Sequence, residues 1–174
     1  SQAGKETATK QSFTDGGALE NLGIIPLLRR QYPIVIAFVN GQQPLGVPSS
    51  QTVDGIDGQI SQLFGLDPED VVGGVERNIH IFPTEQFPAL AEGLMVSHEE
   101  GNGAFFVDSY QLVQPNPFDL PPYPEDSKVT VVWFYNSLNT NWYDQLPDEI
   151  RDLLRLTEPT HNFSHFPNFS TIGQ

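Results

Sequence analysis

The chain alternates between short apolar runs and stretches rich in proline, glycine and polar residues. Runs of β-branched and aromatic residues predict strands at residues 32–40, 103–113 and 128–135. We expect the first of these to be a buried strand, and the almost continuous apolarity of the last predicts burial on both of its faces. A shorter alternating run at residues 78–82 predicts another strand.

Apolar residues at helical spacing predict helices at residues 54–64 and 84–95, the second with Thr84 as its cap. A further helix is predicted at residues 147–155, where acidic residues come early and basic residues late, as the helix dipole favours. Proline-rich and glycine-rich segments predict loops at residues 41–50 and 114–126. The pattern therefore predicts one α/β segment over residues 1–174, with residues 1–11 flexible.

One acidic residue, Asp15, stands before Gly16 and Gly17 at a predicted passage from a strand to a helix. Glycines lack Cβ atoms and adopt backbone angles that other residues avoid, so such a turn can project the carboxylate outward. Local chemistry alone also fits a structural turn, since Asp caps helices and Gly tolerates turns. A functional role for Asp15 requires a partner for its carboxylate.

Residues 15–30, with the hydrophobic strand that follows, resemble the second catalytic segment of the patatin-like and cytosolic phospholipase-like acyl hydrolases. In that superfamily an Asp-Gly-Gly follows a strand, Asn-Leu-Gly opens a helix, and a run such as Pro-Leu-Leu-Arg-Arg leads to the next strand. Residues 166–171 are similar to the aromatic-rich closing segment of the cytosolic phospholipase and fungal lysophospholipase branch. The resemblance implies an α/β sheet flanked by helices, of which this chain is the C-terminal half.

The resemblance also implies a Ser–Asp dyad that hydrolyses lipid esters, of the phospholipase A or lysophospholipase type. Asp15 would be the general base, deprotonating first the serine and later a water molecule, while Gly16 and Gly17 would hold its approach angle. The chain contains no Gly-x-Ser-x-Gly motif and no glycine-rich oxyanion loop. We therefore expect a companion chain, produced from the same precursor, that carries both.

Two other functions stay open at the level of sequence. The chain can be a binding or structural module that keeps the fold but has lost catalysis, in which case the companion chain lacks the serine. Alternatively, Ser1 can be an N-terminal nucleophile whose free α-amine is the base, although residues 1–6 show no strand pattern to hold it. The aromatic residues, Trp133 and Trp142 among them, suit either core packing or an acyl-chain pocket.

Composition limits the classes of partner. Hydrophobic residues make up 38% of the chain, enough for a core, and no run approaches the 18 or so apolar residues of a membrane span. A net charge of −14 argues against binding nucleic acid and against electrostatic docking on anionic lipid. Residues 1–11 lack the apolar core of a signal peptide, and the compartment stays open.

The remaining candidate chemistry is sparse. The chain has no cysteine, which excludes disulfides and thiolate metal sites, and we expect no cofactor. His161 and His165 have the spacing of a helical metal pair, but the flanking prolines argue against a helix there. Asn162 and Asn168 each begin an Asn-Phe-Ser triplet and are possible glycosylation sites.

Overall fold

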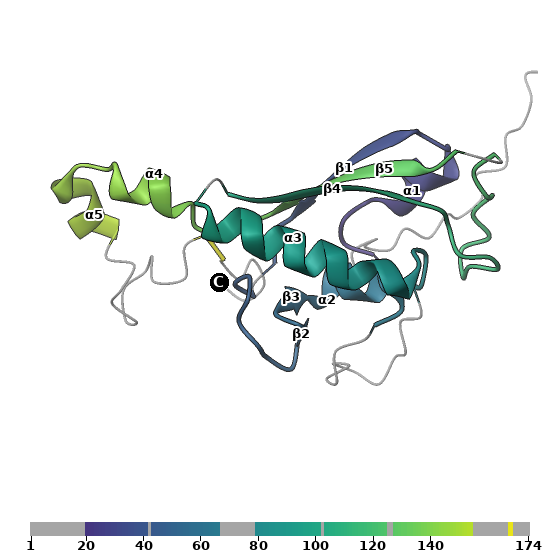
Figure 1. Ribbon diagram of the computed structural model, residues 1–174, viewed down its shortest axis with the longest axis horizontal. Coiled ribbons are helices and arrows are strands. Elements are labelled where there is room, and N and C mark those ends of the chain that lie inside the picture. The colour runs from purple at the N-terminus through teal and green to yellow at the C-terminus, as the bar shows by residue number, and fades with distance from the viewer. Residues whose placement is uncertain are drawn as a thin grey trace, which may run out of the picture.

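The computed structural model describes residues 20–41, 43–66, 79–101, 103–124, 127–154 and 167–168. These residues form a small mixed α/β fold in which helices lie against a sheet (Figure 1). Its strands are β1 (Ile34–Val39), β2 (Thr52–Val53), β3 (Ile56–Asp57), β4 (Ala104–Tyr110) and β5 (Val129–Tyr135). Its α-helices are α1 (Ile25–Arg29), α2 (Gly58–Ser61), α3 (Phe87–Glu99), α4 (Thr140–Asp144) and α5 (Asp148–Leu154). Two short 3₁₀ helices are η2 (Gln62–Phe64) and η3 (Thr84–Gln86).

The central sheet contains three strands in the order β1–β5–β4. β1 and β5 are parallel, from Ile34 opposite Thr130 to Val39 opposite Tyr135, and β4 is antiparallel to β5. The sheet is therefore mixed, with β5 in its centre and β1 along one edge. The strands predicted at residues 32–40, 103–113 and 128–135 are confirmed, each slightly shorter than its apolar run.

Only one face of this sheet is buried among the described residues. Successive strand residues point to opposite faces, and in β1 the buried and exposed side chains alternate strictly. In β5, Trp133 is fully buried whereas the neighbouring Phe134 is exposed. The prediction that the strand at residues 128–135 is buried on both faces is wrong. Apolar residues do occupy both faces, but the described elements cover one of them.

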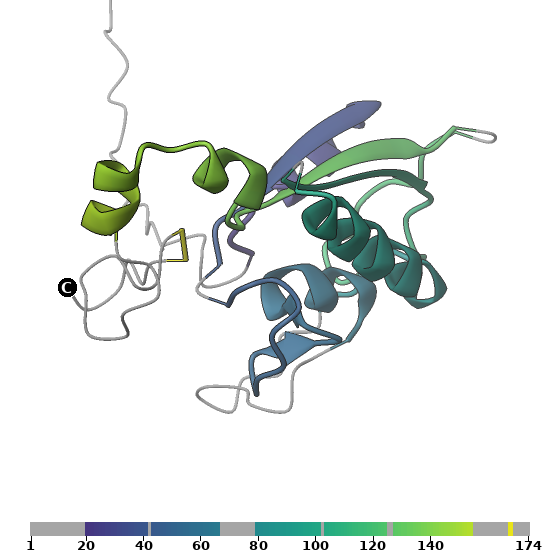
Figure 2. The ribbon, with the colours of Figure 1, turned by 60° about the vertical axis from the view of Figure 1, so that its left-hand side comes forward.

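Helix α3 and the α2–η2 unit lie together on the buried face (Figures 1 and 2). Phe64 of η2 is at the centre, with its ring centroid 5.4–6.4 Å from four other aromatic rings. Those rings belong to Phe82, Phe87, Tyr110 and Trp133. The indole Nε1 of Trp133 donates a hydrogen bond to the Tyr110 hydroxyl at 3.1 Å, which satisfies its polar atom inside the core. Core packing is thus confirmed for Trp133, whereas Trp142 in α4 is exposed.

The helix predicted at residues 54–64 begins later than its apolar spacing indicated. Asp54 and Gly55 both have positive φ, 50° and 74°, and form the two-residue turn of the β2–β3 hairpin. Such primed turns require positive φ at both central positions, and Asp-Gly is a favoured pair. Ile56 therefore lies in a strand, and only Gly58–Ser61 is α-helical.

The strand predicted at residues 78–82 is absent from residues 79–82, which the structure describes. Ile81 and Phe82 are adjacent, yet both are fully buried and both donate their N–H groups to the Leu63 carbonyl at 2.8 Å. The alternating residues therefore belong to a loop whose backbone is hydrogen-bonded to η2, and not to a strand. Thr84 is also not a cap, because its hydroxyl donates to the Phe64 carbonyl at 2.7 Å. Helix α3 itself is confirmed and runs four residues beyond the predicted end, to Glu99.

The predicted helix at residues 147–155 is confirmed as α5, with acidic Asp148 and Glu149 in its first turn. Helices α4 and α5 extend away from the sheet at the end where β5 finishes (Figure 1). Neither helix has a buried residue. Within the described part of the chain, none of the helices has the length and apolar character needed to cross a membrane.

Replacing a leucine under the sheet should reveal how much of the stability depends on the single covered face. Leu94→Ala removes a fully buried side chain of α3 and should lower the free energy of unfolding by about 2–5 kcal/mol. Leu153→Ala makes the same change in α5, where the side chain is 63% exposed, and should cost less than about 0.5 kcal/mol. Urea unfolding measures both. Equal losses for the two variants would contradict the assigned core.

Candidate functional site at the carboxyl edge of the sheet

The parallel strands bring two polar segments to one edge of the sheet. β1 is followed by Asn40 and Gly41, and β5 ends with Tyr135 and is followed by Asn136. The carboxyl ends of parallel strands meet at the same edge, and open α/β sheets bind their ligands there. The carboxyl-edge cluster consists of the residues that meet at this place: Gly41, Asp57, Tyr135, Asn136 and Asn168.

Asp57 connects the hairpin and helix α2 to the end of β1. Its Oδ1 accepts a hydrogen bond from the Gln59 N–H at 2.9 Å and so caps α2. Its Oδ2 lies against Gly41 so closely that a Cβ at that position would be 2.2 Å from it. Burial raises the pKa of the Asp57 carboxyl, while hydrogen bonds from Gln59 and Gln43 oppose the increase. Asp57 therefore caps α2 through Oδ1 and lies against Gly41 through Oδ2, which joins α2 to the end of β1.

Tyr135 fixes the loop that leaves β1. Its hydroxyl donates a hydrogen bond to the Gln43 carbonyl at 2.8 Å. Burial raises the pKa of this phenol above its ordinary value, and the nearby Asp57 carboxylate raises it further. The hydroxyl therefore stays protonated at neutral pH and keeps its role as a donor. This bond links the end of β5 to the loop after β1.

Two asparagines join the C-terminal part of the chain to the same edge. Asn136 donates from Nδ2 to the Pro167 carbonyl at 2.8 Å. Asn168 in turn donates from Nδ2 to the carbonyl of Asn136 at 2.9 Å and to that of Gly41 at 3.1 Å. Asn168 is buried, so the carbonyl groups at the ends of both strands accept hydrogen bonds from its amide and not from water. The closing segment thus bridges β1 and β5.

The segment that follows the Asp-Gly-Gly sequence is attached beside this cluster. The Glu20 carboxylate accepts hydrogen bonds from the N–H groups of Leu22 and Ile24, the latter at 2.8 Å. These bonds hold the entry to α1, whose first N–H groups have no partner within the helix. Asn21 donates to the side chain of Gln59 at 2.9 Å, only two residues from Asp57. Asn21 is therefore linked to α2, the helix that Asp57 caps.

Most of the residues singled out in the sequence lie outside the described part of the chain. Asp15, Gly16, Gly17 and Asn162 all fall there, as do Ser1 and the His161–His165 pair. Asn168 is described, and a glycan on its Nδ2 would have to break at least one of the two hydrogen bonds to the strand ends. Helix α1 lies where the resemblance implied one, after Asn21-Leu22-Gly23.

Asp57, Gly41, Tyr135 and Asn136 were not singled out from the sequence, although the signals were present. Asp57 stands before Ile60, Leu63 and Phe64, which have helical spacing, and an Asp at such a place is typical of a helix N-cap. Gly41 and Asn136 each come just after a predicted strand. If those strands are parallel, the residues after them must lie together. The pairing direction was the missing information.

The contact between Gly41 and Asp57 can be tested with a double-mutant cycle. Gly41→Ala places a methyl group against Oδ2 of Asp57 and should cost about 1–3 kcal/mol of stability, as overpacking does. In an Asp57→Ala background the same substitution should cost much less, because the obstructing carboxylate is gone. Urea unfolding of the four proteins gives the coupling. Additive losses would show that the two residues are not in contact.

The buried Asp57 carboxyl predicts a definite pH dependence of stability. Its raised pKa means that the folded protein holds the proton more tightly than the unfolded chain does. The contribution of Asp57 to the free energy of unfolding is therefore greatest below about pH 4, the ordinary pKa of Asp. It is lost as the pH rises through the pKa of Asp57 in the folded protein. The free energy of unfolding of the wild type, minus that of Asp57→Asn, should fall over this range.

The matched control for this titration is Asp119→Asn, which removes an exposed carboxylate from the loop between β4 and β5. This variant shows how the loss of one exposed negative charge changes the free energy of unfolding of a chain with a net charge of −14. If the difference between wild type and Asp57→Asn rises with pH, the folded state favours the ionised carboxylate and the assignment is wrong.

Within the described residues, no group of three or more His, Cys, Asp or Glu side chains is arranged to hold a metal ion. The carboxyl-edge cluster is instead a network of hydrogen bonds that fixes the ends of two parallel strands. Comparison of the chain with models of known protein families, with curated proteins and with solved structures finds no match.

Proposed function

We propose that the chain is the C-terminal part of an α/β lipid acyl hydrolase, with Asp15 as the general base for a serine on a companion chain. The Asp15 carboxylate takes the proton of the serine hydroxyl as its oxygen attacks the ester carbonyl. The proton then passes to the departing alcohol, leaving an acyl-serine. Asp15 next takes a proton from water, whose oxygen attacks the acyl carbon, and the serine is restored by the return of that proton.

The observation that carries this proposal is the hydrogen bond between Asn21 and Gln59, two residues after the Asp57 cap of α2. Asn21 is hydrogen-bonded to Gln59 beside the Asp57 cap, and Glu20 fixes the entry to α1. Four residues stand between Asp15 and Glu20 in the sequence, so an extended chain allows at most about 18 Å between them. The proposal requires the Asp15 carboxylate to act within this reach, at the edge where open α/β sheets hold their functional groups.

The carboxyl-edge cluster supports the proposal in a second way. A general base must be held at a fixed distance and angle from its proton donor, and this needs a rigid support. Asp57, Tyr135 and Asn168 tie the ends of β1 and β5 to the hairpin and to the closing segment. The chain has a net charge of −14, so a lipid substrate would be held by apolar contacts.

The test is Asp15→Asn, assayed in the assembly with the companion chain on p-nitrophenyl esters and on lysophosphatidylcholine. The amide keeps the size of the side chain but cannot take a proton, so kcat should fall by about 10²-fold or more. Urea unfolding should be nearly unchanged. Asp119→Asn, the same chemical change in the loop between β4 and β5, should keep full activity.

Near-normal ester hydrolysis by Asp15→Asn would refute the dyad. Loss of activity in Ser1→Ala with Asp15→Asn unaffected would instead assign the chemistry to an N-terminal nucleophile. Sequencing the companion chain separates an enzyme from an inactive module, since the proposal requires a serine within Gly-x-Ser-x-Gly.

A further inference from the structure

The two residues that follow β1, Asn40 and Gly41, lie in different surroundings. Asn40 is exposed, whereas Gly41 is buried within the carboxyl-edge cluster. Asparagine is a thermolabile residue, and it deamidates most readily before glycine, because glycine has no Cβ to obstruct attack of its backbone nitrogen on the asparagine side chain. The sequence thus places a reactive pair at the end of a central strand.

The backbone ladder between β1 and β5 ends just before Gly41. The N–H of Asn136 donates to the carbonyl of Val39 at 2.9 Å, and in a parallel pair the next bond would run from the N–H of Gly41 to the carbonyl of Asn136. That carbonyl instead accepts a hydrogen bond from Nδ2 of Asn168 at 2.9 Å. Among the described residues, the N–H of Gly41 has no acceptor. The nitrogen of this glycine is therefore outside the ladder.

A second acidic-type pair at the same edge, Asp57 and Gly58, shows the opposite arrangement. The N–H of Gly58 donates to the carbonyl of Gln51 at 2.9 Å. Oδ1 of Asp57 accepts a hydrogen bond from the N–H of Gln59, also at 2.9 Å. Both the attacking nitrogen and the side chain that it would attack are engaged, so we expect this pair to be stable.

Gly41 is held in place through its other atoms. Its carbonyl accepts a hydrogen bond from Nδ2 of Asn168 at 3.1 Å, and Oδ2 of Asp57 lies where a Cβ of residue 41 would be. The Asn168 latch consists of the two hydrogen bonds from Nδ2 of Asn168, to the carbonyls of Gly41 and Asn136. Attack on the Asn40 side chain requires the peptide between residues 40 and 41 to rotate toward it, so the latch slows the reaction.

We propose that Asn40 is a site of spontaneous deamidation, that the Asn168 latch controls its rate, and that the modification opens this latch. The Gly41 nitrogen forms a bond to Cγ of Asn40, and the side-chain amide leaves as ammonia with the proton that the Gly41 nitrogen gives up. Water then opens the five-membered imide. Attack of water at Cγ leaves aspartate at this position, and attack at the backbone carbonyl carbon leaves isoaspartate.

The isoaspartyl product changes the path of the main chain directly before Gly41. Its main chain runs through the side chain of residue 40 and is one carbon longer. Because the carbonyl of Gly41 is bonded to Asn168 and its Cα is packed against Asp57, the added carbon displaces both contacts. Neither the reaction nor its consequence involves Asp15 or a companion chain, so the modification does not depend on the proposed function.

The rate of the reaction is tested by incubating the wild type and Asn168→Ala at mildly alkaline pH. Isoaspartate at position 40 is measured by peptide mapping and by enzymatic methylation of the isoaspartyl carboxylate. We expect Asn40 to be modified in the wild type, and about tenfold faster in Asn168→Ala, which lacks two hydrogen bonds that restrain the peptide. Asn40→Gln, whose longer side chain closes a less favourable ring, should form no isoaspartate at this position.

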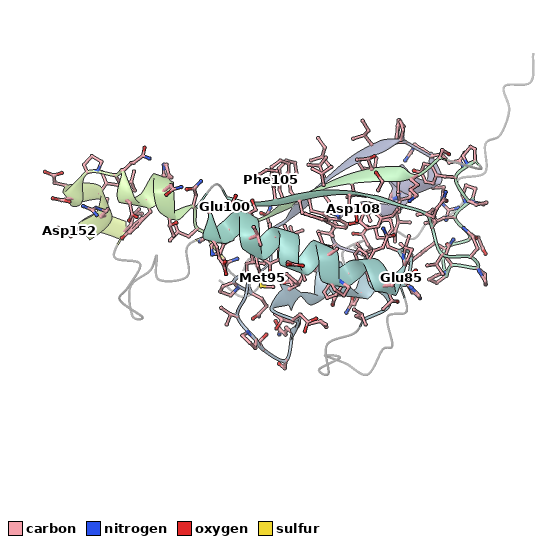
Figure 3. All side chains as sticks on the ribbon, in the orientation of Figure 1. Glu85, Met95, Glu100, Phe105, Asp108 and Asp152 are labelled. Atoms are coloured by element: carbon pink, nitrogen blue, oxygen red, sulfur yellow. The ribbon has the colours of Figure 1, made fainter. Side chains whose placement is uncertain are left out.

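Asn141 is the internal control in the same digests. It is exposed, as Asn40 is, but the bulky Trp142 follows it. Its amide donates to the carbonyl of Glu100 at 3.2 Å, and Figure 3 labels Glu100 at this end of α3. Asn141 should stay unmodified in both proteins. Equal modification of Asn40 and Asn141, or equal rates at Asn40 in the wild type and in Asn168→Ala, would overturn the inference.

The opening of the latch is measured on the modified protein itself. Asn102→Gln first removes the other Asn-Gly pair of the chain, and the deamidated fraction is separated by anion exchange through its additional negative charge. Asn40→Asp in the same background carries this charge on an unaltered main chain. The deamidated fraction should unfold at a lower urea midpoint than freshly purified Asn40→Asp.

Equal urea midpoints for these two proteins would show that the latch survives the modification, and the inference would fall. Both proteins retain Asn168, so this comparison decides the question even if Asn168→Ala does not fold. Where Asn168→Ala does fold, deamidation should lower its midpoint little further, because the latch is already absent.

Discussion

The parallel pairing of β1 with β5 is the constraint on which the rest of the structure depends. These strands are far apart in the sequence, and their register brings Ile34 opposite Thr130 and Val39 opposite Tyr135. The pairing determines which side chains meet at the carboxyl edge, which form the core, and which are exposed on the side of the sheet away from α3. Long-range pairs of this kind form at a high cost in chain entropy, so the burial of Trp133 and its neighbours has to offset that cost.

The sequence was sufficient to predict the three main strands and two of the longer helices, because each has a strong local pattern. It was insufficient where two local patterns overlapped. Ile56, Ile60 and Leu63 have helical spacing, but the Asp54–Gly55 turn decided the conformation and placed Ile56 in a strand. Consecutive burial of Ile81 and Phe82 likewise depends on Leu63, a contact that no local window contains.

The same limit applies to the candidate site. Asp15 can be singled out because its motif is local, whereas the carboxyl-edge cluster joins residues that only the fold brings together. The side chain of Asn168 reaches Gly41 across most of the chain, and no spacing rule links these two positions. The almost continuous apolar character of β1 and β5 correctly indicated apolar residues on both faces. It did not reveal which of those faces the described helices cover.

The exposed face of the sheet, on the side away from α3, differs in its side chains from an ordinary exposed surface. A strand that faces water on one side usually alternates apolar and polar residues, and Lys on an edge strand discourages pairing with other chains. β1 has neither feature: Ile34, Ile36 and Phe38 are exposed, and all of its residues are apolar. The strict alternation of β1 is therefore an alternation of exposure and not of side-chain polarity.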